Sequence, residues 1–247
     1  MKGIIKLLLA KFGYRFTRID YYENLVNINS VPSQDFYYLF KNKIDKEQSI
    51  CCFDIGANIG QTAKKLAGYF PNAIIHSFEP VKETFELLEK NLAGYSNIRT
   101  YNFAMGSKEG KVEIFHRPNS EWNSLVDVLN ENGKNIGASS ETISVDTIDN
   151  FARQNNISRI DILKSDTEGF EMEVLKGAKY CLENQLINMI YIEVGFSKKD
   201  KQHTYFTYIM EELENYGYGC SGLFEKCYTK ENVIHYANAL FCKREKQ

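Results

Sequence analysis

Short apolar runs alternate with segments of helical spacing from residue 50 to the end of the chain. The apolar runs are β-prone and short enough for buried strands. Predicted strands cover residues 50–54, 74–79, 98–103, 160–165 and 188–194, with antiparallel additions or edge strands at 111–115 and 238–243. Predicted helices cover residues 60–70, 81–93, 146–155, 168–183 and 203–216. This alternation predicts right-handed βαβ units, and therefore an α/β fold with a mostly parallel sheet covered by helices on both faces.

Residues 1–48 are predicted to form a helical N-terminal extension, which Pro32 interrupts. The extension is expected to pack on a single domain formed by residues 49–247. The first residues, MKGIIKLLLAKFGYRF, have a short apolar stretch broken by Lys6 and no small-x-small cleavage site, unlike a signal peptide. An amphipathic helix docked on the domain is expected, and a helix lying on a membrane surface is the alternative. No segment is long enough to cross a bilayer, so stable membrane insertion is not expected.

The charge and cysteine content limit the classes of partner. The chain of 247 residues carries 30 Lys and Arg against 32 Asp and Glu, which gives no electrostatic reason to expect nucleic acid. The six cysteines form no CxxC pair and have no His at metal-ligand spacing, which indicates reduced thiols and a cytoplasmic location. A small-molecule acceptor is the expected partner, and the sequence leaves open whether the chain forms a homo-oligomer.

The stretch FDIGANIGQTAKK joins the first strand to a helix through a glycine-containing turn. Such a turn points backbone N–H groups at a ligand. A dinucleotide site requires G-x-G-x-x-G, but counting from Gly56 the other two glycine positions hold Asn58 and Gln61. The pattern D-x-G-x-x-x-G, formed here by Asp54, Gly56 and Gly60, instead suits S-adenosylmethionine, whose ammonium an acid can bind and whose carboxylate can accept from loop N–H groups.

The next two strand ends extend this predicted cofactor site. Glu79, followed by Pro80, ends the second strand, where an acid accepts hydrogen bonds from ribose hydroxyls in NAD sites as well. Asn102 and Ala104 lie at the third strand end and are expected to border an adenine ring. The structural alternatives are an N-cap for Asp54, ordinary turn glycines, and a surface acid at residue 79.

Five motifs carry a family resemblance: FDIGANIGQTA, then SFEP at 77–80, NFAMG at 102–106, VDTIDNF at 145–151 and DILKSDTEGFEMEVLKGA at 161–178. They resemble the FkbM family of S-adenosylmethionine-dependent methyltransferases, and the segment K-x-D-x-E-G-x-E is the most specific of them. The resemblance implies the seven-stranded class I methyltransferase (Rossmann-like) fold and O-methylation of a hydroxyl, on substrates that include sugars and polyketide alcohols. Residues 1–48 and 117–141 lie outside it and are expected to select the acceptor.

Three acids are candidates for the chemical step. Asp166 ends the fourth parallel strand, Glu168 follows two residues later, and Glu193 ends the neighbouring strand. An unactivated alcohol needs a group that takes its proton, or a metal that lowers its pKa. We expect Asp166 to be this base or to orient the acceptor, and the three acids together suit a divalent cation such as Mg²⁺. His116 and His235 are the alternative bases.

The same segment also has a purely structural interpretation. Ser165 and Glu168 are spaced as a capping box, in which the acid reaches back to the first turn of a helix. Glu171 and Glu173 are expected to be solvated or paired locally, and Lys164, inside a strand, is expected to pair with an acid.

The sequence therefore predicts an S-adenosylmethionine-dependent O-methyltransferase that acts on a sugar or nucleotide-linked sugar in surface glycan (capsule or lipopolysaccharide) biosynthesis. Three alternatives remain at this point: a methyltransferase of a polyketide or other secondary-metabolite alcohol, an NAD-dependent oxidoreductase, and a catalytically inactive cofactor-binding scaffold.

Overall fold

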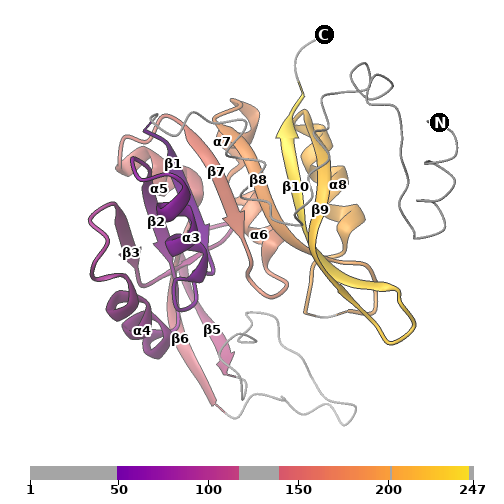
Figure 1. Ribbon diagram of the computed structural model, residues 1–247, viewed down its shortest axis with the longest axis horizontal. Helices are drawn as coiled ribbons and strands as arrows, with labels where there is room; N and C mark the ends of the chain where they lie inside the picture. Colours follow the sequence, from indigo (N-terminus) through magenta and orange to yellow (C-terminus); the bar gives the residue numbers. More distant parts are fainter. Residues whose placement is uncertain (1–48, 117–138, 201, 245–247) are drawn as a thin grey trace, which may run out of the picture. The chain divides into compact units, whose positions relative to one another are not determined.

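The computed structural model describes residues 49–116, 139–200 and 202–244 (Figure 1). The predicted N-terminal extension and most of the 117–141 segment lie outside these residues. Within them, alternating strands and helices build a seven-stranded sheet in the order β3-β2-β1-β7-β8-β10-β9. The strands of this sheet are β1 (Cys51–Ile55), β2 (Ile74–Phe78), β3 (Ile98–Tyr101), β7 (Ile160–Ser165), β8 (Ile187–Gly195), β9 (Tyr218–Tyr228) and β10 (Ile234–Lys243).

The first five strands of this order are parallel, as the alternating pattern predicts, and the last two run antiparallel to their neighbours. The predicted antiparallel strand at 238–243 is confirmed as part of β10, whereas β9, which forms the edge of the sheet, was not predicted. The sequence of β9, YGCSGLFEKCY, alternates poorly between buried and exposed positions, so it carries no period-2 signal.

A second, three-stranded sheet has the order β4-β6-β5. The predicted strand at 111–115 is confirmed as β5 (Gly110–His116), and it pairs antiparallel with β6 (Ser139–Asp146). Beside β6 lies the short strand β4 (Ala104–Met105), which continues the chain just beyond β3. The last residues of the 117–141 segment, which was expected to select the acceptor, therefore belong to the strand β6.

Two apolar clusters cover the two faces of the main sheet. On one face, α3 (Gln61–Tyr69) and α4 (Lys82–Leu92) pack against side chains such as Cys52, Ile75 and Ile162. On the other face, four helices pack against Phe53, Leu163 and their neighbours. These helices are α5 (Ile148–Gln154), α6 (Glu171–Lys176), α7 (Lys179–Glu183) and α8 (Phe206–Asn215). Helices on both faces confirm the predicted α/β layering.

The helix predicted for 168–183 is two short helices, because the chain passes close to another backbone at Gly177. A Cβ atom at this position would lie 1.9 Å from the carbonyl oxygen of Gly106, so only glycine fits there. α6 ends at this contact, and α7 starts two residues later.

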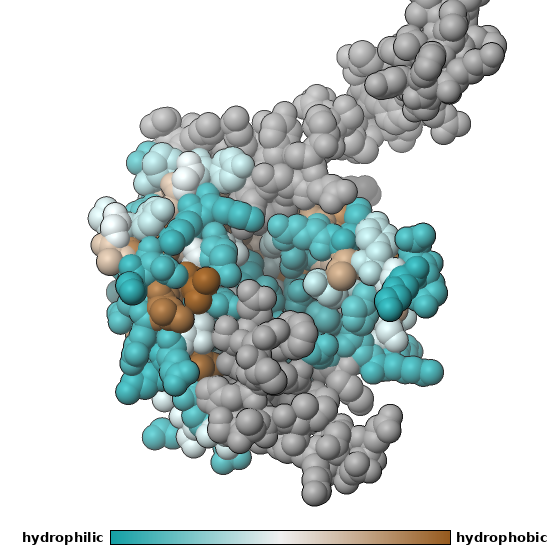
Figure 2. Space-filling model, turned by 60° about the horizontal axis from the view of Figure 1, so that its bottom comes forward, coloured by the Kyte–Doolittle hydropathy of each residue, from teal (hydrophilic) through white to brown (hydrophobic). Residues whose placement is uncertain are grey.

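The surface drawn in Figure 2 is mostly hydrophilic over the described residues, and apolar side chains form small patches on it. Among the helices that the structure describes, none combines the length and the apolar character needed to cross a bilayer.

Candidate functional site

A cavity of about 560 Å³ lies beside the carboxyl ends of β1, β2, β7 and β8. The strand order reverses between β1 and β7, and open α/β sheets bind their ligands at such a point. Its lining includes a group of small and polar residues that contains most of the predicted site: Gly56, Ala57, Asn58, Glu79, Pro80, Ala104, Asp166, Thr167, Glu168, Glu193, His203 and His235. The cavity therefore brings together most of the residues predicted for the cofactor and for catalysis.

The turn after β1 is held against β7 by a glycine. Gly56 has φ +72°, and a Cβ atom there would lie 1.8 Å from the carbonyl oxygen of Asp166. Any side chain would therefore separate the two strand ends that border the cavity. Gly60, also at positive φ, precedes α3 and packs under Leu88 and Leu92 of α4, so it shapes the turn from behind the lining.

Glu79 closes the cofactor end of the cavity, and the backbone fixes both of its carboxylate oxygens. Oε2 accepts the N–H of Asn58 and Oε1 accepts the N–H of Val81, each at 3.0 Å. Burial raises the pKa of this acid to about 7, although the two backbone N–H groups and Lys164 act in the opposite direction. Behind it, the amide of Asn102 donates to the carbonyl oxygens of residues 79 and 80, so it braces the strand end from outside the lining.

Asp54 is fully buried beneath the cavity and pairs with a buried lysine. Its Oδ1 lies 3.3 Å from Nζ of Lys164, which also donates to the carbonyl oxygen of Gly56 at 2.9 Å and lies 3.6 Å from Asp166. Burial lowers the pKa of Lys164, but the carboxylates of Asp54 and Asp166 outweigh it and raise the pKa. The expectation that Lys164 pairs with an acid is confirmed, because both Asp54 and Asp166 lie within ion-pair distance. The N-cap alternative for Asp54 is wrong, because Gly60 occupies that position of α3.

The turn after β7 differs from the predicted capping box. Glu168 has φ +53° and Gly169 has φ +98°, so the chain is not helical here and α6 begins only at Glu171. Glu171 performs the local capping: its Oε1 accepts from the N–H and hydroxyl of Thr167 and from the N–H of Gly169. These hydrogen bonds confirm local pairing for Glu171, the second of its two expected states, and its side chain is fully buried rather than solvated. The expected local pairing of Glu173 is confirmed by Lys176.

The three predicted catalytic acids lie around one part of the cavity. Asp166 follows β7, and its backbone N–H donates to the carbonyl oxygen of Ile55, while its side chain is about one third exposed. Glu193 is buried on β8, and burial together with the carboxylates of Asp166 and Glu168 raises its pKa to about 11. The strand-end rule therefore brought together the three acids that the sequence singled out.

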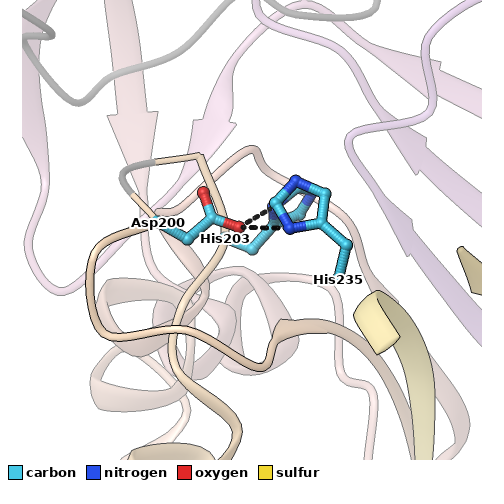
Figure 3. Close-up of side chains that lie close together, drawn as sticks. All are labelled: Asp200, His203 and His235. Carbon is cyan, nitrogen blue, oxygen red and sulfur yellow. Dashed lines mark hydrogen bonds and ion pairs between the residues drawn. The ribbon is translucent and has the colours of Figure 1, made fainter. Parts of the chain in front are cut away.

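Two histidines complete this end of the cavity, and one of them, His203, was not predicted from the sequence as a site residue. In Figure 3, His203 and His235 both lie against Asp200. Nδ1 of His203 is 2.8 Å from Oδ2 of Asp200, and Nδ1 of His235 is 3.8 Å from the same oxygen. The ring of His203 stacks on Tyr236 with centroids 4.5 Å apart. His203 lies in the loop before α8, which was predicted as the first turn of the helix, so no pattern distinguished it from a surface residue.

The alternative bases differ in position. His235 lines the cavity and has a partly exposed side chain. His116 ends β5 in the second sheet, and its side chain lies outside the described part of the chain.

The sheet order, the layering and the strand-end cavity define the class I methyltransferase fold. The chain superposes on the methyltransferase domain of METTL16 with a TM-score of 0.50 and 12% identity, over 85% of this chain and 67% of that one. Residues 54–220 match the model of the methyltransferase FkbM domain, and the chain belongs to this family. Membership confirms the predicted methyltransferase class and its cofactor, S-adenosylmethionine, and removes the oxidoreductase alternative.

Over the aligned residues, three named relatives are about one quarter identical to this chain. Hexuronic acid methyltransferase AglP of Haloferax volcanii is 24% identical over 78% of this chain and 75% of its own. Methyltransferase sdnD of Sordaria araneosa is 28% identical over 50% of this chain, and 2-O-methyltransferase NoeI of Sinorhizobium fredii is 25% identical over 52%. The chain spans 58% of the length of sdnD and 57% of that of NoeI.

The residues around the turn after β1 fit S-adenosylmethionine. The carboxylate of Glu79 already accepts two N–H groups, and its remaining acceptor capacity suits the two ribose hydroxyls. The small side chains of Ala57 and Ala104 leave room in the lining for a flat ring.

Proposed function

We propose that this protein is an S-adenosylmethionine-dependent O-methyltransferase that methylates a hydroxyl group of a sugar or nucleotide-linked sugar in surface glycan biosynthesis. The observation that carries the proposal is the position of three acids in the same cavity as Glu79: Asp166 and Glu168 in the turn after β7, and Glu193 on β8. The printed names of two relatives, a hexuronic acid methyltransferase and a 2-O-methyltransferase, support a sugar acceptor.

The proposed cofactor site comprises two sets of residues. Residues of the lining contact the cofactor. The turn around Gly56 and Asn58 contacts its methionyl end, Glu79 and Pro80 contact the ribose, and Ala104 contacts the adenine ring. The second set holds the lining in place: Asp54 through Lys164, Gly60 through the start of α3, and Asn102 through the strand-end carbonyl groups. When bound, S-adenosylmethionine supplies a methyl group that its sulfonium already activates.

The protein then has to align the acceptor oxygen and remove its proton. Asp166 takes the proton at a carboxylate oxygen, since it is the acid nearest the strand-order reversal and is open to the cavity. Lys164, whose Nζ lies 3.6 Å from Oδ2 of Asp166, orients this carboxylate. Glu168 and Glu193 lie on the acceptor side and hold the hydroxyl in line with the methyl group.

Methyl transfer to a panel of acceptors tests the proposal. With radiolabelled S-adenosylmethionine, we expect label in nucleotide sugars or hexuronic acids, and mass spectrometry of the product should place the methyl group on oxygen. A panel of polyketide alcohols is the control, chosen because polyketide alcohols are the alternative acceptors. Labelling of these alcohols and not of sugars would refute the sugar assignment, and S-adenosylhomocysteine binding without transfer to any acceptor would support the scaffold alternative.

A further inference from the structure

We propose that Glu168, Glu193 and His203 bind one divalent cation at the acceptor end of the cavity. This inference rests on the proposed function, because it gives the acceptor hydroxyl a ligand site, but the binding itself is measured without any acceptor. It also replaces the ligand set expected from the sequence: the imidazole of His203 enters, and Asp166 is left to take the proton.

The distances between the ligand atoms suit a single ion. One ligand atom of each of the three residues lies within 4.8 Å of the other two, and Nε2 of His203 is 3.6 Å from Oε2 of Glu193. Metal bonds to imidazole and carboxylate are about 2.0–2.2 Å long. Two ligands at tetrahedral angles on one ion are then roughly 3.4 Å apart. Small side-chain adjustments therefore bring the three atoms onto one centre.

His203 is oriented as a metal ligand rather than as a surface side chain. Its Nδ1 bonds to Asp200, whose Oδ1 accepts the N–H of Gln202 at 2.9 Å, and its ring stacks on Tyr236. Metal-binding histidines usually donate their second ring N–H to a carboxylate in this way, which fixes the tautomer and the ring orientation. The arrangement leaves Nε2 directed at Glu193 on the cavity side.

Glu193 supplies an independent reason to expect a cation. The residue is 8% exposed, and its Oε2 has no hydrogen-bond partner among the described residues. A buried carboxylate oxygen without a partner is costly, and further acids lie around it. The buried cation nearby, Lys164, is already shared between Asp54 and Asp166. A divalent ion would give this oxygen the partner that it lacks among the described side chains, and it would favour the ionised form of the carboxylate.

The donor set indicates the kind of ion and its use. Two carboxylates and one imidazole suit Mn²⁺ or Zn²⁺ better than Ca²⁺, which prefers oxygen ligands alone. Three protein ligands leave coordination positions open, and a sugar can fill them with neighbouring hydroxyl oxygens. A hydroxyl bound there would lose its proton more easily. As its oxygen forms a bond to the methyl carbon, the bond from that carbon to the sulfonium sulfur breaks, S-adenosylhomocysteine leaves, and the proton passes to Asp166.

Direct titration with Mn²⁺ tests the site on the full chain after EDTA treatment and dialysis. Calorimetry and electron paramagnetic resonance should show one Mn²⁺ per chain. The binding should weaken at least tenfold in His203→Ala and in Glu193→Gln, and about tenfold or more in Asp200→Asn, since loss of a ligand's hydrogen-bond partner typically costs 10–100-fold in affinity. Circular dichroism and a denaturant melt establish that each variant is folded.

Two further variants separate the proposal from its rivals. Glu173→Gln on α6 is the matched acid control and should bind Mn²⁺ like the wild type. His235→Gln should also bind normally, whereas strong weakening in this variant would move the ion to the neighbouring group of Asp200, His203 and His235 and refute the ligand set. Absence of Mn²⁺ and Zn²⁺ binding to the wild type would refute the site. Neither result depends on whether methyl transfer is observed.

Discussion

Replacing Asp166 by asparagine is expected to lower kcat by about a hundredfold or more, the usual scale for losing a general base. The side chain keeps its size, but it loses the negative charge and the basicity that take up the acceptor proton. The surrounding structure should survive the change, because Lys164 retains Asp54 as a partner at 3.3 Å and the backbone N–H of residue 166 still bonds to Ile55.

Steady-state kinetics with a saturating acceptor measure the effect, and calorimetry with S-adenosylhomocysteine provides the control. Cofactor affinity should change little, since the proposed cofactor contacts are made by the turn after β1 and by Glu79. A near-normal kcat in Asp166→Asn would refute the role as base. An equal loss of cofactor affinity would instead mean that the carboxylate contacts the cofactor.

Replacing Asp54 by asparagine is expected to lower the free energy of unfolding by about 3–5 kcal/mol, the usual range for breaking a buried ion pair. The carboxylate is fully buried, and Lys164 is almost as deeply buried beside it. Without Asp54, the ammonium group keeps only Asp166, which is 3.6 Å away and partly exposed to water. This prediction assigns the main effect of residue 54 to stability, whereas its place in the motif suggested a direct cofactor contact.

Urea denaturation followed by circular dichroism measures the change. Glu183→Gln is the matched control, because it removes the acid of a surface ion pair with Lys179 and should cost less than about 1 kcal/mol. Asp54→Asn with wild-type stability but greatly weakened cofactor binding would contradict the structural role and restore the direct contact.

Much of the fold could be predicted because strand and helix periods are local properties. Each parallel strand lies within two residues of its predicted range; the third ends at Tyr101, two residues earlier than predicted, and a separate short strand, β4, follows at Ala104. The edge strand β9 escaped prediction because its residues do not alternate between buried and exposed positions. The strand β6 was not predicted, although buried Ile143 and Val145 alternate there with exposed neighbours. The division between α6 and α7 depends on the contact between Gly177 and Gly106, which are far apart in the sequence.

The site residues that lie at strand ends could be predicted from the sequence. The site residues that lie in loops could not. Glu79, Asp166 and Glu193 each end a strand, so a single rule about open sheets places them at one edge. His203 and Asp200 come from the loop after β8, whose path is set by tertiary contacts such as the hydrogen bond from Thr204 to the buried Glu171. No periodic pattern in the sequence indicates the path of such a loop.

Binding of S-adenosylhomocysteine across a pH series tests the central claim, that this cavity holds the cofactor with Glu79 on the ribose. Ribose hydroxyls donate to the ionised carboxylate, and the pKa of this group is raised to about 7, with Lys164 and Asp54 as the charged groups acting on it. The acid is therefore mostly protonated at pH 6 and mostly ionised at pH 8, so affinity should rise about tenfold between them.

Isothermal titration calorimetry of the wild type and of Glu79→Gln gives the decisive comparison, with Glu89→Gln on the exposed side of α4 as the control. The account predicts that Glu79→Gln binds about 1.5–3 kcal/mol more weakly at pH 8, the cost of losing hydrogen bonds to a charged group, and that its affinity no longer follows pH. The control should match the wild type at every pH. Wild-type affinity and pH dependence in Glu79→Gln would contradict the account.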